Sequence, residues 1–192
     1  MNLRVIDYIR EANDGRIIPR TVDDVKHVII HRAGLSIART PDKLIEAFQD
    51  TREFAAGSFT GGQIPYTFLI TTDGRVYQLL HVDDVGWHAR RWSLTGIGVA
   101  VAGDFRNHEP TEEQWDSLLE LSALLCYWIG PGYQLAGHTE LPLATNIAGK
   151  ECPGSHLDMA ELREQVKDRV LGTKVLDKLA KKLVLLNYGL VI

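Results

Sequence analysis

The chain has few cysteines and no excess of positive charge. Only Cys126 and Cys152 occur among its 192 residues, too few for the disulfide framework of a small secreted domain. Cys126 lies in an apolar helical run, so we expect it to be a buried core thiol. Lys and Arg total 21 against 25 Asp and Glu, for a formal net charge of −4. Non-specific nucleic-acid binding normally requires a basic excess, so we expect no nucleic-acid partner.

Long hydrophobic runs are also missing from the sequence. No stretch approaches the ~20 consecutive apolar residues that span a bilayer. Residues 1–16 carry charges every few positions and lack the apolar region of a secretory signal, so we expect a chain that is cytoplasmic as synthesised. Its length suits one compact domain that buries a core without disulfides or a structural metal.

Strands and helices alternate along the chain. Apolar runs and a hairpin turn at 72–75 predict strands at 25–31, 66–70, 76–80, 97–102 and 133–136. Caps and apolar stripes predict helices at 41–56, 112–129 and 158–171. We therefore expect an α/β fold, a single domain with a central mixed β-sheet covered by helices on its faces. The expected domain spans 25–171. An N-terminal arm at 1–24, with one or two helical turns, precedes it, and an amphipathic and apolar tail at 172–192 follows it.

The loop at 137–154 carries the residues with the clearest chemical potential. His138 and Cys152 stand near its two ends, and Lys150 lies two positions before the thiol. Imidazole and thiolate are good Zn²⁺ ligands, and a nearby cation favours the thiolate. The alternative is that both side chains only pack in the core. Two ligands do not complete a site, so further ligands must come from elsewhere.

Other polar residues fall at strand ends and in loops. His31 ends the first predicted strand, and Tyr66 opens the hairpin. The loop at 86–95 combines tryptophan and arginine, whose flat side chains suit a ligand-facing wall. The alternatives are an edge histidine facing water and a solvated loop anchored by its tryptophans. The loop's candidate substrate-binding residues are Trp87, His88, Arg90 and Arg91.

Four segments together resemble the zinc-dependent N-acetylmuramoyl-L-alanine amidases, a family that includes phage lysozyme-type amidases and peptidoglycan-recognition proteins. The segments are VIIHRAG, IPYTFLITTDGRVYQ, GWHARRWSLTGIGVAVAGDF and GHTELPLATNIAGKECPG. They cover most of residues 25–165 in the family's order. The resemblance implies that His31, His138 and Cys152 bind Zn²⁺ and that Tyr66 and Lys150 are catalytic. A His₂Cys set leaves the fourth tetrahedral position to water, as a catalytic zinc requires.

The chain departs from the family pattern at three positions. Arg32 follows the first ligand where many relatives carry His, Cys or Ser. Thr67 stands where many have a histidine, which makes it a further candidate for substrate contact. Ala100 replaces a glutamate of the branch that acts on anhydromuropeptides, which favours a tyrosine–lysine arrangement over a carboxylate base. Gly86-Trp87 resembles the pair that recognition proteins use for diaminopimelate-type stems.

The resemblance implies a peptidoglycan hydrolase of the endolysin type, which cleaves the bond between N-acetylmuramic acid and L-alanine in the cell wall with zinc-activated water. Such an enzyme without a signal peptide would reach the wall after phage-type release. The alternative is a non-catalytic module that binds peptidoglycan or muropeptides, although such modules typically lack the cysteine ligand that is present here. A zinc-stabilised scaffold is a third reading without specific support. For the tail, docking on the domain or self-association is favoured over membrane contact, because burial of apolar side chains contributes more than weak surface attachment.

Overall fold

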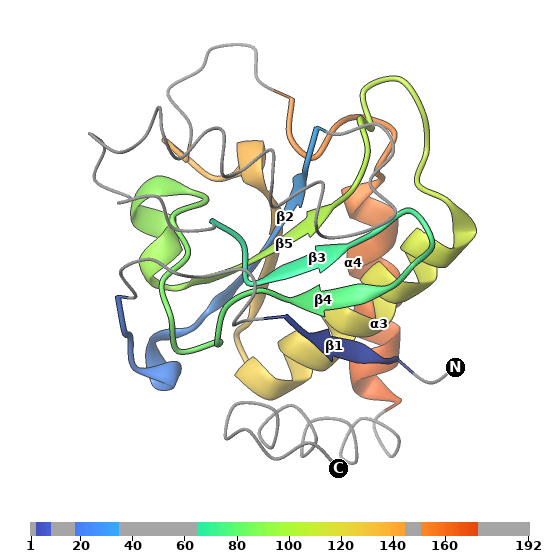
Figure 1. The fold of residues 1–192 in the computed structure, drawn as a ribbon. Coiled ribbons are helices and arrows are strands. Elements are labelled where there is room, and N and C mark those ends of the chain that lie inside the picture. Colours follow the sequence, from blue (N-terminus) through green and yellow to red (C-terminus); the bar gives the residue numbers. More distant parts are fainter. Residues whose placement is uncertain (1–2, 9–17, 35–64, 145–150, 173–192) are drawn as a thin grey trace, which may run out of the picture.

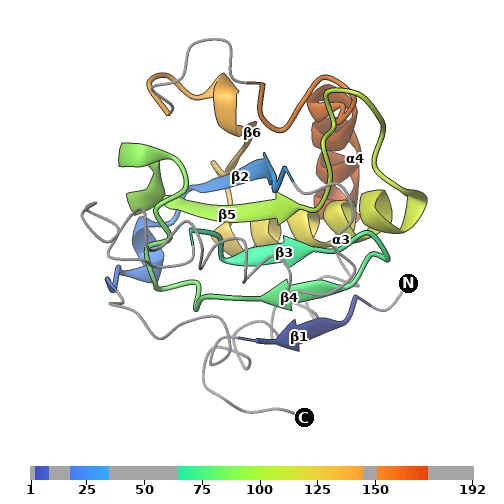
Figure 2. The same ribbon diagram turned by 45° about the horizontal axis from the view of Figure 1, so that its top comes forward.

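The computed structural model describes residues 3–8, 18–34, 65–144 and 151–172, which form a six-stranded mixed sheet. In spatial order its strands are β1 (Val5–Asp7), β4 (Val76–Gln78), β3 (Phe68–Ile70), β5 (Gly96–Val101), β2 (His27–Arg32) and β6 (Gln134–Gly137). β3 and β4 form an antiparallel hairpin, and all other neighbouring pairs are parallel. Figure 1 shows the order from β1 to β2, and Figure 2 also labels β6 beside β2. The expected single domain with a mixed sheet is confirmed.

Two helices cover one face of the sheet, α3 (Glu112–Ile129) and α4 (Met159–Leu171) (Figures 1 and 2). The Thr111 side chain caps α3 by accepting a hydrogen bond from the backbone of Gln114, as the sequence predicts. Asp158 caps α4 in the same way. The main core lies between this helix pair and the strand side chains that face it. Among the residues that the structure describes, no helix combines the length and apolar composition that crossing a bilayer requires.

The two faces of β5 differ in side-chain size. Ile97, Val99 and Val101 point toward the helices and belong to the main core. The alternating positions on the opposite face carry only small residues, Gly96, Gly98 and Ala100. That face therefore has room for larger side chains from neighbouring segments, and the polar residues of the predicted site lie on this side of the sheet.

The N-terminal arm differs from its expected helical turns. Val5–Asp7 forms the edge strand β1, which pairs in parallel with β4. The β-branched Val5 and Ile6 favour extended backbone, and the outer edge of β4 offers them hydrogen-bond partners. Three short 3-10 segments complete the described elements, η1 (Val22–Asp24), η2 (Arg90–Leu94) and η3 (His138–Glu140). The expected helix at 41–56 and the tail from 173 onward lie outside the described residues.

Candidate metal centre

Three predicted ligands meet at one end of the sheet. β2 and β6 are parallel neighbours with Ile30 opposite Gly137, so the next residues, His31 and His138, emerge side by side. Cys152 reaches the same point from its loop. The candidate ligand atoms of the three residues all lie within 4.8 Å of one another, and all three side chains are buried. Nothing in the spacing along the chain shows this convergence without the strand register.

Each imidazole is held through its Nε2 atom. His31 Nε2 lies 2.9 Å from His88 Nδ1, and His138 Nε2 lies 3.0 Å from the carbonyl oxygen of Ala144. The two rings are stacked at a tilt with centroids 4.5 Å apart. His31 Nδ1 faces the Cys152 sulfur at 3.8 Å. Metal-binding histidines are usually oriented by a hydrogen bond from the second ring nitrogen, and both histidines have such a contact.

The donor set suits a zinc ion. Two imidazole nitrogens and one thiolate form a set that catalytic zinc sites use, with one position left for water. Ligand atoms at roughly 2.0–2.3 Å from a tetrahedral ion lie on the order of 3.5 Å from one another. The 3.8 Å separation between His31 Nδ1 and Cys152 Sγ needs only a slight contraction to match that value. His31, His138 and Cys152 are therefore the residues that would hold the metal.

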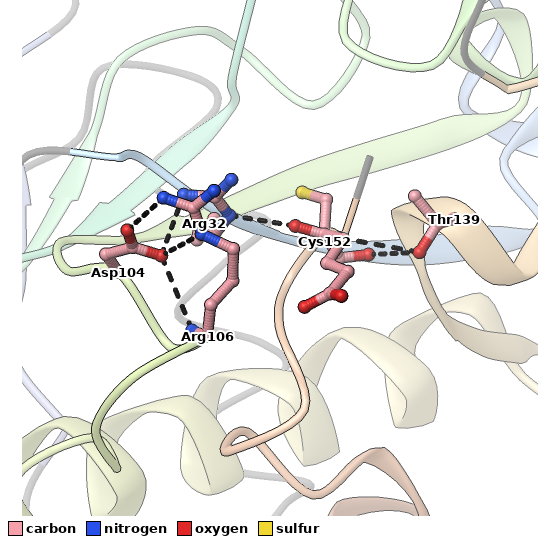
Figure 3. A network of polar contacts seen from close by, with 6 residues as sticks. Arg32, Asp104, Arg106, Thr139 and Cys152 are labelled. Atoms are coloured by element: carbon pink, nitrogen blue, oxygen red, sulfur yellow. Dashed lines mark hydrogen bonds and ion pairs between the residues drawn. The ribbon is translucent and has the colours of Figure 1, made fainter. Parts of the chain in front are cut away.

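The loop that carries Cys152 is anchored on both sides by the residues that follow the two histidines. Arg32 Nε donates to the carbonyl oxygen of Glu151 at 2.8 Å. The backbone N–H and the hydroxyl group of Thr139 donate to the carbonyl oxygen of Cys152 at 3.0 and 2.9 Å. Figure 3 shows these two anchors on either side of Cys152. The position of the thiol is thus tied to the end of β2, which carries His31, and to η3, which carries His138.

Arg32 is itself oriented by an acidic partner. Its Nη1 donates to Asp104 at 2.9 Å, and Arg106 binds the same carboxylate (Figure 3). Hydrogen bonds from Arg106, with the positive charge of Arg32, hold the pKa of Asp104 well below its usual range. Beyond the thiol, Gly154 has a φ of 119°, and a Cβ atom there would lie 2.5 Å from the Phe105 carbonyl oxygen. A side chain at this position would push the loop away from its anchors.

Tyr66, the predicted catalytic tyrosine, lies beside the ligand cluster. Its ring centroid is 5.0 Å from that of His31. Burial, and the nearby Cys152, raise the pKa of the Tyr66 phenol. The group is therefore a neutral hydrogen-bond donor at ordinary pH. The other predicted catalytic residue, Lys150, lies outside the described residues.

The predicted substrate-binding residues occupy different environments. Arg90 and Arg91 are exposed at η2, and Arg91 lies over the Trp92 ring at 5.1 Å. Trp87 is half-buried, whereas Thr67 is fully buried next to Tyr66. His88 is buried behind His31. Burial lowers the pKa of His88 to about 3, so its ring is neutral.

Arg20, in the N-terminal arm, stabilises the loop that contains His88. Nothing in the sequence pattern predicts this role. The Arg20 guanidinium donates to the carbonyl oxygens of Val82, Ser93 and Gly96 at distances of 2.7–3.0 Å. Burial lowers its pKa to about 10, which leaves it charged. Arg20 thus holds together the two ends of the loop that contains His88.

Comparison with known proteins identifies a family over the same region. The family described as N-acetylmuramoyl-L-alanine amidase matches residues 21–155. Among individual relatives, peptidoglycan-recognition protein LB of Drosophila melanogaster is 27% identical over 151 residues, which are 74% of this chain and 62% of that protein. The match therefore spans less than two thirds of that relative's length.

Solved structures share the fold. The amidase LysC from Clostridium intestinale URNW superposes with a TM-score of 0.66 at 21% identity, covering 85% of this chain and 97% of LysC. Peptidoglycan recognition protein-LE, solved in complex with tracheal cytotoxin, a monomeric diaminopimelic acid-type peptidoglycan, superposes with a TM-score of 0.66 at 22% identity. Coverage is 83% of this chain and 92% of that protein. At these identities the two structures establish similarity of fold.

Proposed function

The chain belongs to the N-acetylmuramoyl-L-alanine amidase family, and on this basis we propose that it is a zinc-dependent peptidoglycan hydrolase. The bond cleaved is the amide between N-acetylmuramic acid and L-alanine. The observation that carries the proposal is the buried cluster of His31, His138 and Cys152, whose ligand atoms lie within 4.8 Å of one another. Amide hydrolysis at neutral pH needs an activated water, and a zinc ion supplies that activation together with Lewis-acid polarisation of the carbonyl group.

The protein's own residues supply the remaining functions. Tyr66 is a neutral phenol beside His31, so it would donate a hydrogen bond to the substrate carbonyl oxygen or orient the attacking water. Lys150 would place a positive charge near the oxyanion that forms when water adds to the carbonyl carbon. Donors aimed at a developing oxyanion lower the barrier because the charge is greater in the transition state than in the substrate.

We propose muropeptides with carboxylate-bearing stems as the substrate class. Arg90 and Arg91 are exposed on η2, and a guanidinium group can bind a carboxylate through two parallel hydrogen bonds. The related recognition protein bound to a diaminopimelic acid-type peptidoglycan supports a ligand of this kind. Gly86-Trp87 lies at the start of the same loop and is consistent with that stem type.

A second candidate function is peptidoglycan binding without cleavage, which the similarity to proteins named for peptidoglycan recognition supports. The presence of Cys152 in the cluster favours the enzyme, since a module that only binds peptidoglycan has no need of a third metal ligand. The two functions make different predictions for insoluble cell walls. Both bind the walls, but only the enzyme solubilises them in a metal-dependent way.

The test is digestion of purified cell walls by the full chain. We expect a fall in turbidity that a chelator abolishes and that added Zn²⁺ restores. Sedimentation of the protein with the same walls should continue in chelator. Binding without any release of wall material, with and without added Zn²⁺, would instead support the recognition module.

A further inference from the structure

The ring of His88, a predicted substrate-binding residue, lies behind His31, a predicted metal ligand. It is buried, and its Nδ1 atom lies 2.9 Å from His31 Nε2. The two rings are nearly perpendicular, with centroids 4.9 Å apart, so an edge of one ring meets the other. Gly98 creates the space for this arrangement, because a Cβ atom there would lie 2.8 Å from the His88 ring. The His88 ring therefore occupies the space that a side chain at position 98 of β5 would fill.

The far side of the His88 ring contacts a group that can only accept. His88 Nε2 lies 3.3 Å from the carbonyl oxygen of Gly96. This same oxygen is held in place by Arg20 Nη1 at 2.7 Å. A carbonyl oxygen has no proton to give, so in this contact the proton is on His88 Nε2. A neutral imidazole carries one ring proton, which leaves His88 Nδ1 as an acceptor.

The proton position on His88 also fixes which atom donates in the hydrogen bond between His88 and His31. If His88 Nδ1 accepts, then His31 Nε2 donates across the 2.9 Å contact. His31 Nδ1 then carries no proton, and it faces the Cys152 sulfur at 3.8 Å. His138 also donates from Nε2, because this atom contacts the Ala144 carbonyl oxygen directly. The two histidines therefore present their Nδ1 atoms to the same place.

We propose that His88 is a positioning residue that holds His31 in its Nε2–H tautomer, so that Nδ1 is directed at the metal. The His88 ring connects the backbone carbonyl group of Gly96 to the imidazole of His31 through two hydrogen bonds. This inference rests on the metal site of the proposed function but not on any step of catalysis. Partners of this kind typically change metal affinity by about 10–100-fold when removed.

Two substitutions of His88 distinguish its contact with His31 from its contact with Gly96. In His88→Asn the side-chain oxygen can occupy roughly the position of Nδ1 and still accept from His31. In His88→Gln the amide reaches toward Gly96 instead and leaves His31 without its former acceptor. We expect the zinc dissociation constant of the full chain, measured by competition with a chromophoric chelator, to rise by about 10–100-fold in His88→Gln and His88→Ala. The increase should be much smaller in His88→Asn.

A spectroscopic measurement on the zinc-loaded wild-type chain tests the same proposal without any variant. NMR with ¹⁵N-labelled histidine should show the shared proton on His31 Nε2 and a scalar coupling across the hydrogen bond to His88 Nδ1. A proton located on His88 Nδ1, or equal zinc affinities in all three variants and the wild type, would overturn the proposal. Equal losses in His88→Asn and His88→Ala would also overturn it, since general damage to packing would then be the cause. No readout uses peptidoglycan, so failure of wall cleavage with these results intact would refute only the proposed function.

Discussion

Arg32 donates from its Nε atom to the carbonyl oxygen of Glu151 at 2.8 Å, although 119 positions separate the two residues in the chain. This contact fastens the Cys152 loop to the end of the strand that carries His31 (Figure 3). The contact therefore ties the loop that carries the thiol to the strand that carries the imidazole. The arginine at this position is a departure from the family pattern, and the structure gives it a specific use.

Removal of the Arg32 anchor should weaken metal binding. In Arg32→Ala the loop loses the hydrogen bond to the Glu151 carbonyl oxygen, while Thr139 still donates to the Cys152 carbonyl oxygen. We expect the zinc dissociation constant to rise by about tenfold, as for loss of other outer-sphere contacts. Arg106→Ala is the matched control, because Arg106 binds the same Asp104 carboxylate without a described hydrogen bond to Glu151. Equal zinc affinities in the two variants would show that the anchor does not position the thiol.

The two cysteines provide a direct test of the ligand set. Both are buried and neither forms a disulfide, but only Cys152 lies in the ligand cluster. Cys126 lies within α3, and burial raises its pKa to about 12, so it stays a thiol. We expect elemental analysis of purified Cys152→Ala to show most of the zinc lost and Cys126→Ala to keep about one ion per chain. Full zinc occupancy in Cys152→Ala would remove the cysteine from the ligand set.

Tyr66 should act on the reaction more than on binding. Tyr66→Phe removes a hydroxyl group beside His31 and leaves the ring. We expect kcat on muropeptides to fall about 10²–10³-fold, as for loss of an oxyanion donor, with zinc content unchanged. Tyr77→Phe is the matched control, since Tyr77 is a buried tyrosine of β4 outside the ligand cluster. A Tyr66→Phe enzyme that turns over as fast as Tyr77→Phe would exclude the phenol from the mechanism.

Much of this fold and part of this site could be predicted from the sequence. The capping box at Thr111, the hairpin turn at 72–75 and the apolar runs depend on neighbours in the chain, and the structure confirms the elements that they predict. The cluster of His31, His138 and Cys152 required the resemblance, because only the pairing of β2 with β6 brings residues so far apart together.

The supporting contacts of the site could not be predicted. Arg20 and Arg32 bind backbone carbonyl oxygens 62–76 and 119 positions away, and a carbonyl group is the same at every residue. His88 stands in a loop rich in tryptophan and arginine, which suggested a substrate wall. Its burial depends on Gly98, whose role becomes visible only once β5 is packed against the loop.

Arg90 and Arg91 should contribute to substrate affinity. Both are exposed on η2, and a guanidinium group can bind the stem carboxylates of the proposed substrate. We expect the double variant Arg90→Ala/Arg91→Ala to raise KM for muropeptides several-fold and to leave kcat nearly unchanged, because a contact made equally in substrate and transition state affects binding alone. Arg75→Ala, at an exposed arginine of the hairpin turn, is the control. An unchanged KM in the double variant would show that the arginines of η2 face solvent and do not contact the substrate.

The proposed reaction is hydrolysis of one particular bond, the amide between N-acetylmuramic acid and L-alanine. Mass spectrometry of the products from a purified muropeptide tests it most directly, because hydrolysis at that amide leaves a sugar with a free lactyl carboxylate and a peptide that begins with L-alanine. We predict both products in the presence of Zn²⁺ and neither product after chelation or in Cys152→Ala. Intact muropeptide under all conditions, or peptides cut within the stem, would contradict the account.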